Sequence, residues 1–282
     1  MLHEEAMIVR LGISAWTARK YDNKVTRKVV QDFGTSQDSG RFNKSLVARE
    51  SLQGITRATA NARAFHQMNT LPWDDAGGRI LPSANFLKYS QGMRALRDEY
   101  ERVVKAFIRE YPEFRDAAEK RLGKMYSATD YPAVNALRKK FQFTIDFDPI
   151  PHVDDFRVTL KEHDRVRISE ELTQRIDRRV EAANRDCYVR LYEIVKRFVK
   201  TLSDPGKRFH RTMMARALEL VELLPALNIT QDAELELLRK EVHAKLASQS
   251  PDALRTLPEM RASVAKDAKA ILARMAKKVT DV

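Results

Sequence analysis

The chain has 282 residues, 43% of them hydrophobic, so it is long enough to bury a sizeable core. Its 51 Lys and Arg against 39 Asp and Glu give a formal net charge of +12, which favours a polyanionic partner such as nucleic acid, although many basic helical proteins bind no polyanion. A single cysteine, Cys187, excludes an intramolecular disulfide framework, and no Cys and His residues have zinc-ligand spacing.

The N-terminal part predicts one strand and several helices. Apolar residues alternate from Ala6 onward and predict a strand that ends near Trp16. Asp22 is a suitable cap for a short helix, and a polar loop follows over residues 34–40. Helical spacing then predicts two antiparallel helices, over residues 43–68 and 84–111, the second ending before Pro112.

The stretch between these two helices, residues 71–82, is predicted to be a constrained loop, either a hairpin tip or a clamp. Pro72 and Pro82 interrupt a helix at either end, and Gly77 permits a positive φ angle. Constrained loops often present recognition residues, so we expect such residues here.

The next stretch predicts short helices and then strands. Residues 113–125 and 132–141 are predicted to be helical, the second capped by Asp130. Apolar alternation predicts strands over 141–147 and 156–160, joined by a turn at 149–151. Because two strands alone are marginal in water, we expect the N-terminal strand to pair with them.

The C-terminal part predicts a bundle built on one long helix, from about Val166 to Leu202. Its expected partners are helices over 207–224, 231–247 and 253–278, with ends marked by Pro225, by Thr230 as a cap, and by Ser250 with Pro251. The expected fold class is therefore mainly α. An α+β domain with a small antiparallel sheet spans residues 1–160, and a helical bundle spans 161–282.

No specific catalytic or cofactor-binding motif is present. The sequence lacks the phosphate-binding loop, the G-x-G-x-x-G fingerprint, H-E-x-x-H and G-x-S-x-G. Cys187 lies on the apolar stripe of the long helix and is interpreted as a core residue, and His210 and His243 have no recognisable partner. We therefore expect a protein that is not an enzyme and that holds no cofactor or metal.

One enzymatic alternative remains at the turn after the central strand. Asp146, Asp148, Asp154 and Asp155 flank His152, and converging carboxylates and a histidine can bind Mg²⁺ in a nuclease. The simpler interpretation is that these acidic residues cap a turn and solvate the strand ends.

Basic residues on the long helix and near the central loop are the candidate nucleic-acid contacts. Arginine presents a bidentate fork to phosphate, and aromatic rings beside basic groups are typical of single-strand binding. Two simpler interpretations compete with this: interleaved acidic residues indicate an ion-paired face, and Trp73 together with Phe86 fastens the loop onto the core. The candidates are Trp73, Arg79, Lys88, Arg175, Arg178, Arg179, Arg185, Lys196, Arg197 and Lys200.

Several short stretches together resemble a family of uncharacterised proteins encoded by bacteriophages and prophages. They are residues 71–82, 130–132, the strand over 141–147, residues 149–151, 155–158 and 227–232. The resemblance covers most of the chain and implies a gene often found near genes for AAA+ ATPases or DNA metabolism. It implies no catalytic residues.

These observations favour a nucleic-acid-binding protein of phage or prophage type, oligomeric, acting in DNA replication, recombination or host takeover. DNA is favoured over RNA. The alternative is a helical adaptor, regulator or structural protein that binds a protein partner such as an AAA+ ATPase. No run of about 18 apolar residues and no signal-peptide pattern occurs, so we expect the cytoplasm of a bacterial host cell and no membrane contact.

Overall fold

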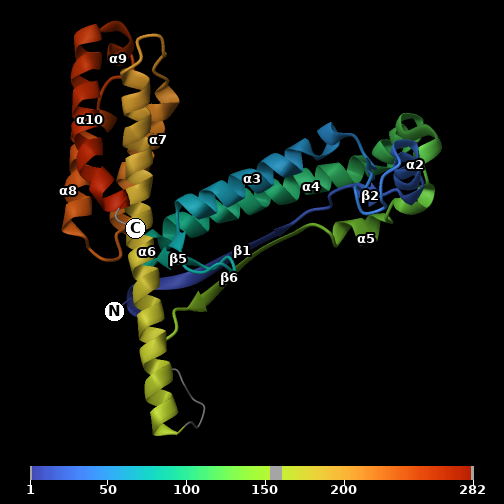
Figure 1. Cartoon of the computed structure of the whole chain (residues 1–282), viewed down its shortest axis with the longest axis horizontal. Helices are drawn as coiled ribbons and strands as arrows, with labels where there is room; N and C mark the ends of the chain where they lie inside the picture. The colour runs from blue at the N-terminus through green and yellow to red at the C-terminus, as the bar shows by residue number, and fades with distance from the viewer. Residues whose placement is uncertain (1, 153–160, 281–282) are drawn as a thin grey trace. The chain divides into compact units, whose positions relative to one another are not determined.

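The computed structural model describes residues 2–152 and 161–280, and the chain is mainly helical, as predicted (Figure 1). By its internal contacts it divides into two compact units. Unit 1 comprises residues 1–10, 67–89 and 146–282, and unit 2 comprises residues 11–66 and 90–145. The predicted domain boundary at residue 160 adjoins the stretch that lies outside the described residues.

A four-stranded antiparallel sheet has the order β4-β5-β1-β6. Its strands are β1 (Ala6–Ser14), β4 (Leu71–Pro72), β5 (Arg79–Pro82) and β6 (Gln142–Pro149). The predicted N-terminal and central strands are confirmed, and so is their position side by side. The other predicted strand, over 156–160, lies outside the described residues.

The stretch 71–82 is a β-hairpin rather than only a loop. Ile80 on β5 pairs with both Leu71 on β4 and Ile8 on β1, so β5 lies inside the sheet. In the turn, the backbone N–H of Gly78 donates to Asp74 Oδ1 at 2.7 Å, and Gly77 has a φ of 90°. The prolines and glycines of the turn were recognised in the sequence. Residues 79–82 are too few to show the alternation of apolar and polar side chains that predicts a strand.

Unit 2 contains an antiparallel helix pair, α3 (Gln53–Met68) and α4 (Phe86–Leu122), whose residues 53–66 and 90–122 belong to this unit. The remaining elements of the unit are β2 (Arg19–Tyr21), α2 (Asn23–Phe33), β3 (Asn43–Ser45), a 3₁₀ turn over Arg49–Leu52 and α5 (Val134–Arg138). Its core gathers apolar residues such as Ile55, Tyr100, Phe107 and Leu137. The predicted α2 and its Asp22 cap are confirmed, because Asp22 Oδ1 accepts from the backbone N–H of Val25 at 3.1 Å.

Three predictions for unit 2 were wrong. The helix predicted from residue 43 begins at Gln53, because residues 43–45 pair with β2. The second helix continues past Pro112 to Leu122. Helix α5 is shorter than predicted and Asp130 does not cap it, because the Asp130 carboxylate is 2.8 Å from Lys44 Nζ instead.

Unit 1 contains the helical bundle, in which α6 (Glu162–Leu202) packs against α7 (Arg211–Leu227), α8 (Ala233–Val242) and α10 (Pro258–Thr280). A π-helical turn over His243–Ala247 and the short α9 (Ala253–Thr256) complete it. The predicted long helix is confirmed. Three details were wrong. Helix α7 runs through Pro225, and α8 is capped by Asp232, whose Oδ1 accepts from the N–H groups of Glu234 and Leu235, rather than by Thr230. The single helix predicted over 253–278 is interrupted at Leu257, whose backbone is extended between α9 and α10.

Candidate nucleic-acid interface

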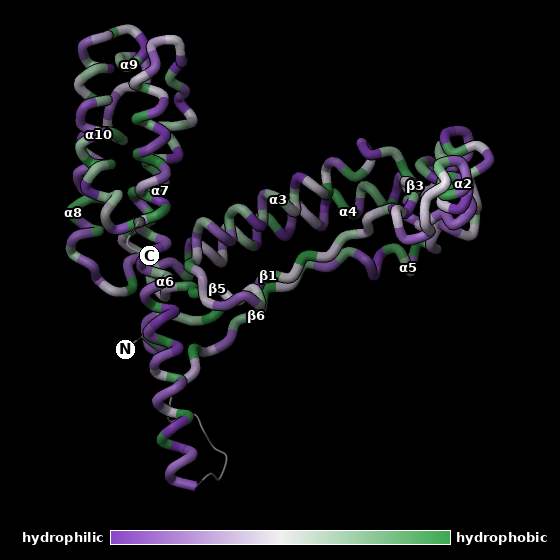
Figure 2. Tube along the Cα trace, in the orientation of Figure 1, coloured by the Kyte–Doolittle hydropathy of each residue, from purple (hydrophilic) through white to green (hydrophobic). Residues whose placement is uncertain are grey.

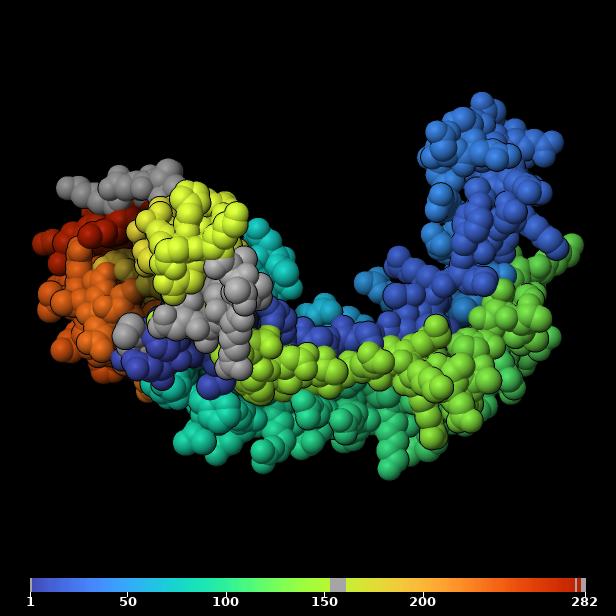
Figure 3. All heavy atoms as spheres, turned by 90° about the horizontal axis from the view of Figure 1, so that it is seen from below, coloured from blue at the N-terminus to red at the C-terminus, as the bar shows by residue number. Residues whose placement is uncertain are grey.

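Helix α6 separates its apolar and basic residues onto different faces. The buried side chains recur at steps of three and four and form one face toward the bundle: Leu172, Ala183, Cys187, Tyr188, Leu191, Val195, Phe198 and Leu202. The stretch before Leu172 has no buried side chain, and this part of the helix is coloured mainly hydrophilic in Figure 2. In the space-filling view, the N-terminal part of α6, in yellow, stands at the surface (Figure 3).

Five of the candidate cations on α6 are exposed and have no ion pair among the described residues: Arg175, Arg178, Arg185, Arg197 and Lys200. At about 3.6 residues per turn, these five positions fall within roughly a third of the helix circumference, opposite the buried face. They extend over residues 175–200, which at 1.5 Å per residue is about 38 Å. We call these five residues the α6 basic face.

Three of the six acidic residues interleaved along this part of α6 have cations of their own. Glu171 pairs with Arg167 at 3.1 Å, Asp186 with Arg190 at 2.6 Å, and Glu193 with Lys196 at 3.4 Å. The candidate Lys196 is therefore an ion-paired residue, although it is exposed. These three carboxylates therefore pair with cations that are not part of the α6 basic face, whereas Glu170, Asp177 and Glu181 have no ion pair among the described residues.

Trp73 and Arg179 form one contact in unit 1. Trp73 is only 5% exposed and belongs to the unit 1 core. The guanidinium carbon of Arg179 lies 4.4 Å from the centre of the Trp73 ring, which is the geometry of a cation–π contact. This arrangement covers a ring face that stacking on a base would require.

Arg79 and Arg190 converge on the backbone carbonyls that follow α3. Arg79 donates to Thr70 O at 3.0 Å and to Thr70 Oγ1 at 2.6 Å. Arg190 donates to Met68 O and Thr70 O, both at 2.7 Å, and to Gln67 O at 3.0 Å. Burial and the nearby charge of Arg190 lower the pKa of Arg79. Cations at a helix C-terminus satisfy its unpaired carbonyls, so both side chains support the fold here.

The candidate Lys88 lies in the first turn of α4 and is exposed. Within the described residues it makes no ion pair. Lys88 is available to an anion, but it makes no contact that links it to the α6 basic face within the described part of the chain.

A small hollow beside Arg197 adds two basic residues that were not among the candidate contacts. His210, which precedes α7, and Arg216, in its second turn, line it together with Arg197, and its volume is about 160 Å³. Ile194 and Met213 supply apolar contacts, and no carboxylate lines it. The sequence did not indicate Arg216, because the side of α7 that packs on α6 is decided by tertiary contacts.

The residues proposed for a nuclease site are only partly described. The carboxylate of Asp148 is ion-paired with Arg10, and the ring of His152 lies 4.3 Å from that of His3. Asp154 and Asp155 lie outside the described residues. Among residues 2–152 and 161–280, no group of three His, Cys, Asp or Glu is placed to hold a metal ion.

Cys187 is buried in the bundle core, and burial raises the pKa of its thiol to about 12. A thiol in this state is a poor nucleophile, because the thiolate is the reactive form.

No protein-family model, no curated protein and no solved structure matches the chain. In the described part of the chain, no helix combines the length and the apolar character needed to cross a bilayer.

Proposed function

We propose that this chain is a nucleic-acid-binding protein without catalytic activity, and that the α6 basic face holds the phosphate backbone. The observation that supports the proposal is the gathering of Arg175, Arg178, Arg185, Arg197 and Lys200 on one exposed face, without ion pairs among the described residues. A protein gains affinity for nucleic acid when such cations displace the counterions condensed on the phosphates.

The distribution of charge on α6 favours this proposal over a face of mutual ion pairs. An interleaved acidic residue would compete with phosphate if it were bonded to the arginines of the face. Glu171, Asp186 and Glu193 are instead bonded to other cations. Arg178 donates through Nε to Gln174 O at 3.3 Å, but none of the five cations has an ion pair among the described residues, so their other donors are available to an external acceptor.

The proposed cellular role rests on the resemblance to phage and prophage proteins. We propose that the chain binds DNA in preference to RNA, as an oligomer, in replication, recombination or host takeover. The alternative role is that of an adaptor for a protein partner such as an AAA+ ATPase, in which the basic charge serves solubility.

The test is a salt series of binding to labelled single- and double-stranded DNA. The variant changes Arg175, Arg178 and Arg185 to Glu; Arg179 is left unchanged because it packs on Trp73. If all three arginines contact phosphates, the slope of log affinity against log salt should fall by about 2 to 3. Affinity at low salt should fall in the same variant.

A matched control changes three exposed lysines, Lys139, Lys266 and Lys269, to Glu, giving the same change in net charge. This control should retain the wild-type salt slope. Equal losses in the two variants would mean that only net charge matters. If the wild-type chain shows no binding at low salt, the adaptor role replaces the proposal and pull-down of an ATPase becomes the next experiment.

A further inference from the structure

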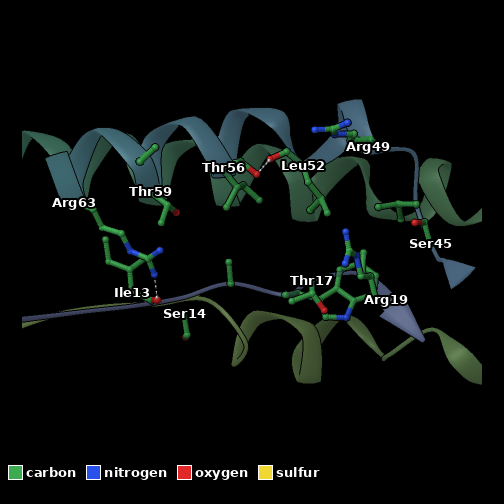
Figure 4. A pocket seen from close by; sticks show the side chains of 16 residues that line it. Ile13, Ser14, Thr17, Arg19, Ser45, Arg49, Leu52, Thr56, Thr59 and Arg63 are labelled. Atoms are coloured by element: carbon green, nitrogen blue, oxygen red, sulfur yellow. Dashed lines mark hydrogen bonds between the residues drawn. The ribbon is translucent and has the colours of Figure 1, made fainter. Parts of the chain in front are cut away.

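A cleft in unit 2 lies apart in sequence from the α6 basic face. Helix α3 and the 3₁₀ turn that precedes it form one wall, and residues 13–19 form the other (Figure 4). Its volume is about 940 Å³, within the range of small-molecule sites. All of its lining residues belong to unit 2.

The lining of the cleft is basic and rich in hydroxyl groups. Arg19, Arg49 and Arg63 line it, and no Asp or Glu does. Arg63 uses one nitrogen to donate to Ile13 O at 3.3 Å, whereas Arg19 and Arg49 have no ion pair in the described part of the chain. Five hydroxyls accompany the arginines, from Ser14, Thr17, Ser45, Thr56 and Thr59.

One of these hydroxyls lacks a partner inside the protein. Thr59 Oγ1 is buried and makes no hydrogen bond. Figure 4 shows the Thr59 side chain directed from α3 toward the facing wall, with Arg63 on the same helix reaching the same side. A buried polar group without a partner is costly, and a ligand in the cleft would supply the missing hydrogen bond.

The opposite wall is held in an uncommon backbone conformation. Ala18 has a φ of 53°, which residues with a Cβ seldom adopt, and its carbonyl accepts from the N–H of Leu46 at 2.7 Å. This turn presents Thr17 and Arg19 to the cleft. Leu52, Ile55 and the ring of Trp16 give the same cleft an apolar surface.

We propose that this cleft binds a phosphate-bearing ligand of nucleotide size. Arginine forks and hydroxyl donors match phosphate oxygens, the absence of lining carboxylates removes competition, and the apolar side accommodates a base or sugar. The phosphate belongs either to a free nucleotide or to a nucleic-acid strand. The inference does not depend on the α6 basic face, because no α6 residue lines the cleft.

The experiment measures binding by calorimetry with two pairs of probes. The first pair is adenosine 5′-monophosphate and adenosine; the second is a short oligothymidylate with and without a 5′-phosphate. The second pair is measured on the α6 charge-reversal variant, because the internucleotide phosphates of both members would bind the α6 basic face of the wild type. We expect the phosphorylated member of at least one pair to bind and its partner to bind about tenfold more weakly or not at all. Binding of adenosine 5′-monophosphate would identify a free nucleotide as the ligand. Binding of the phosphorylated oligothymidylate alone would identify the end of a nucleic-acid strand.

Three variants locate the binding. Arg19→Gln combined with Arg63→Gln should weaken the phosphorylated probe about tenfold or more. Thr59→Val should weaken it without lowering the melting temperature, because the hydroxyl has no partner in the unliganded protein. Arg57→Gln, an exposed arginine of the same helix that does not line the cleft, should change nothing.

Two results would overturn the proposal: no binding of either phosphorylated probe, or equal affinities for the double variant and the Arg57→Gln control. The α6 charge-reversal variant separates this test from the nucleic-acid proposal. It should bind adenosine 5′-monophosphate as the wild type does, even if it has lost longer DNA.

Discussion

Arg190 and Arg185 lie on the same helix but have opposite surroundings. The guanidinium of Arg190 is largely enclosed and bonded to Asp186 and to three backbone carbonyls. Arg185 is exposed, and none of the described residues pairs with it. Arg190 therefore supports the fold, whereas Arg185 is available to a ligand.

We expect Arg190→Ala to destabilise the protein by about 3 kcal/mol, because it leaves carbonyls and a partly buried carboxylate without their donor. Arg185→Ala is the matched control and should change the free energy of unfolding by less than about 0.5 kcal/mol. Denaturant unfolding of both variants measures the difference. Similar values for the two would show that the Arg190 contacts contribute little.

Lys44 is a buried cation in unit 2, with its side chain only 7% exposed. Its Nζ lies 2.8 Å from Asp130 Oδ2 and 3.2 Å from Asp22 Oδ2, and it donates to Met125 O at 2.6 Å. We expect Lys44→Met to cost about 3 kcal/mol, because two carboxylates lose their counter-charge. Lys120→Met, at an exposed lysine, is the control, and chemical denaturation at neutral pH is the measurement.

The same cluster predicts a pH dependence of stability. Hydrogen bonds from the Val25 N–H and from Lys44 outweigh burial and lower the pKa of Asp22 below 3.8. The ionised Asp22 therefore stabilises the fold above pH 3.8, and this stabilisation is lost as the pH falls through the lowered pKa. Burial opposes the charge of Lys44, but Asp130 and Asp22 raise its pKa above 10.5. The charged Lys44 therefore stabilises the fold below pH 10.5, and this stabilisation is lost as the pH rises through the raised pKa.

The difference in stability between wild type and Lys44→Met should therefore be flat between about pH 4 and 10 and should shrink outside that range. Unfolding titrations of both proteins across this range give the profile. A difference that grows toward either extreme would contradict the assignment.

At the scale of elements, helix α4 is sustained through Pro112 by side-chain packing. Proline lacks an N–H and costs about 3 kcal/mol in a helix interior. Aromatic residues on both sides of it pack together, with the Phe107 ring 6.2 Å from Tyr111 and 5.5 Å from Phe114. Tyr111 also donates to Pro132 O at 3.1 Å. The predicted end of the helix was wrong because proline was taken as its stop, whereas this local aromatic packing and the contact of Tyr111 with Pro132, 21 residues away, support the helix through it.

The close approach of α3 and α4 depends on Gly92. A Cβ at this position would overlap the ring of Phe65, whereas a Cβ at Gly54 would meet Val103 at an ordinary 3.8 Å. We expect Gly92→Ala to destabilise by about 1 to 2 kcal/mol, because overpacking outweighs the better helix propensity of alanine. Gly54→Ala should be neutral or stabilising by up to about 1 kcal/mol. Thermal unfolding of both variants tests this contrast, and equal shifts would contradict it.

Periodicity and capping predicted most elements but not their ends or partners. The long α6, the cap at Asp22 and the two main strands follow from local signals. The cap at Asp232 instead depends partly on Asn184 and Tyr188, which donate to its carboxylate from α6. The sequence likewise identified the free arginines of α6, but the enclosure of Trp73 and the lining of the unit 2 cleft depend on tertiary contacts.

At the scale of the whole molecule, the net charge of +12 includes cations in two kinds of surroundings. Many cations are bonded to carboxylates or carbonyls, as Arg190 and Lys44 are. Cations without ion pairs among the described residues include the α6 basic face of unit 1 and two arginines, Arg19 and Arg49, in the cleft of unit 2. Long-range attraction of a polyanion depends on net charge, but the place of contact depends on such free groups.

Site-specific photocrosslinking to DNA tests the location of that contact most directly. A photoreactive amino acid would replace Arg178 or Arg185 on the basic face, and Lys139 or Lys266 in matched proteins. At moderate salt, we expect DNA adducts from positions 178 and 185 and few or none from positions 139 and 266. Equal adducts from all four positions, or none from the basic face while DNA remains bound, would contradict the proposed interface.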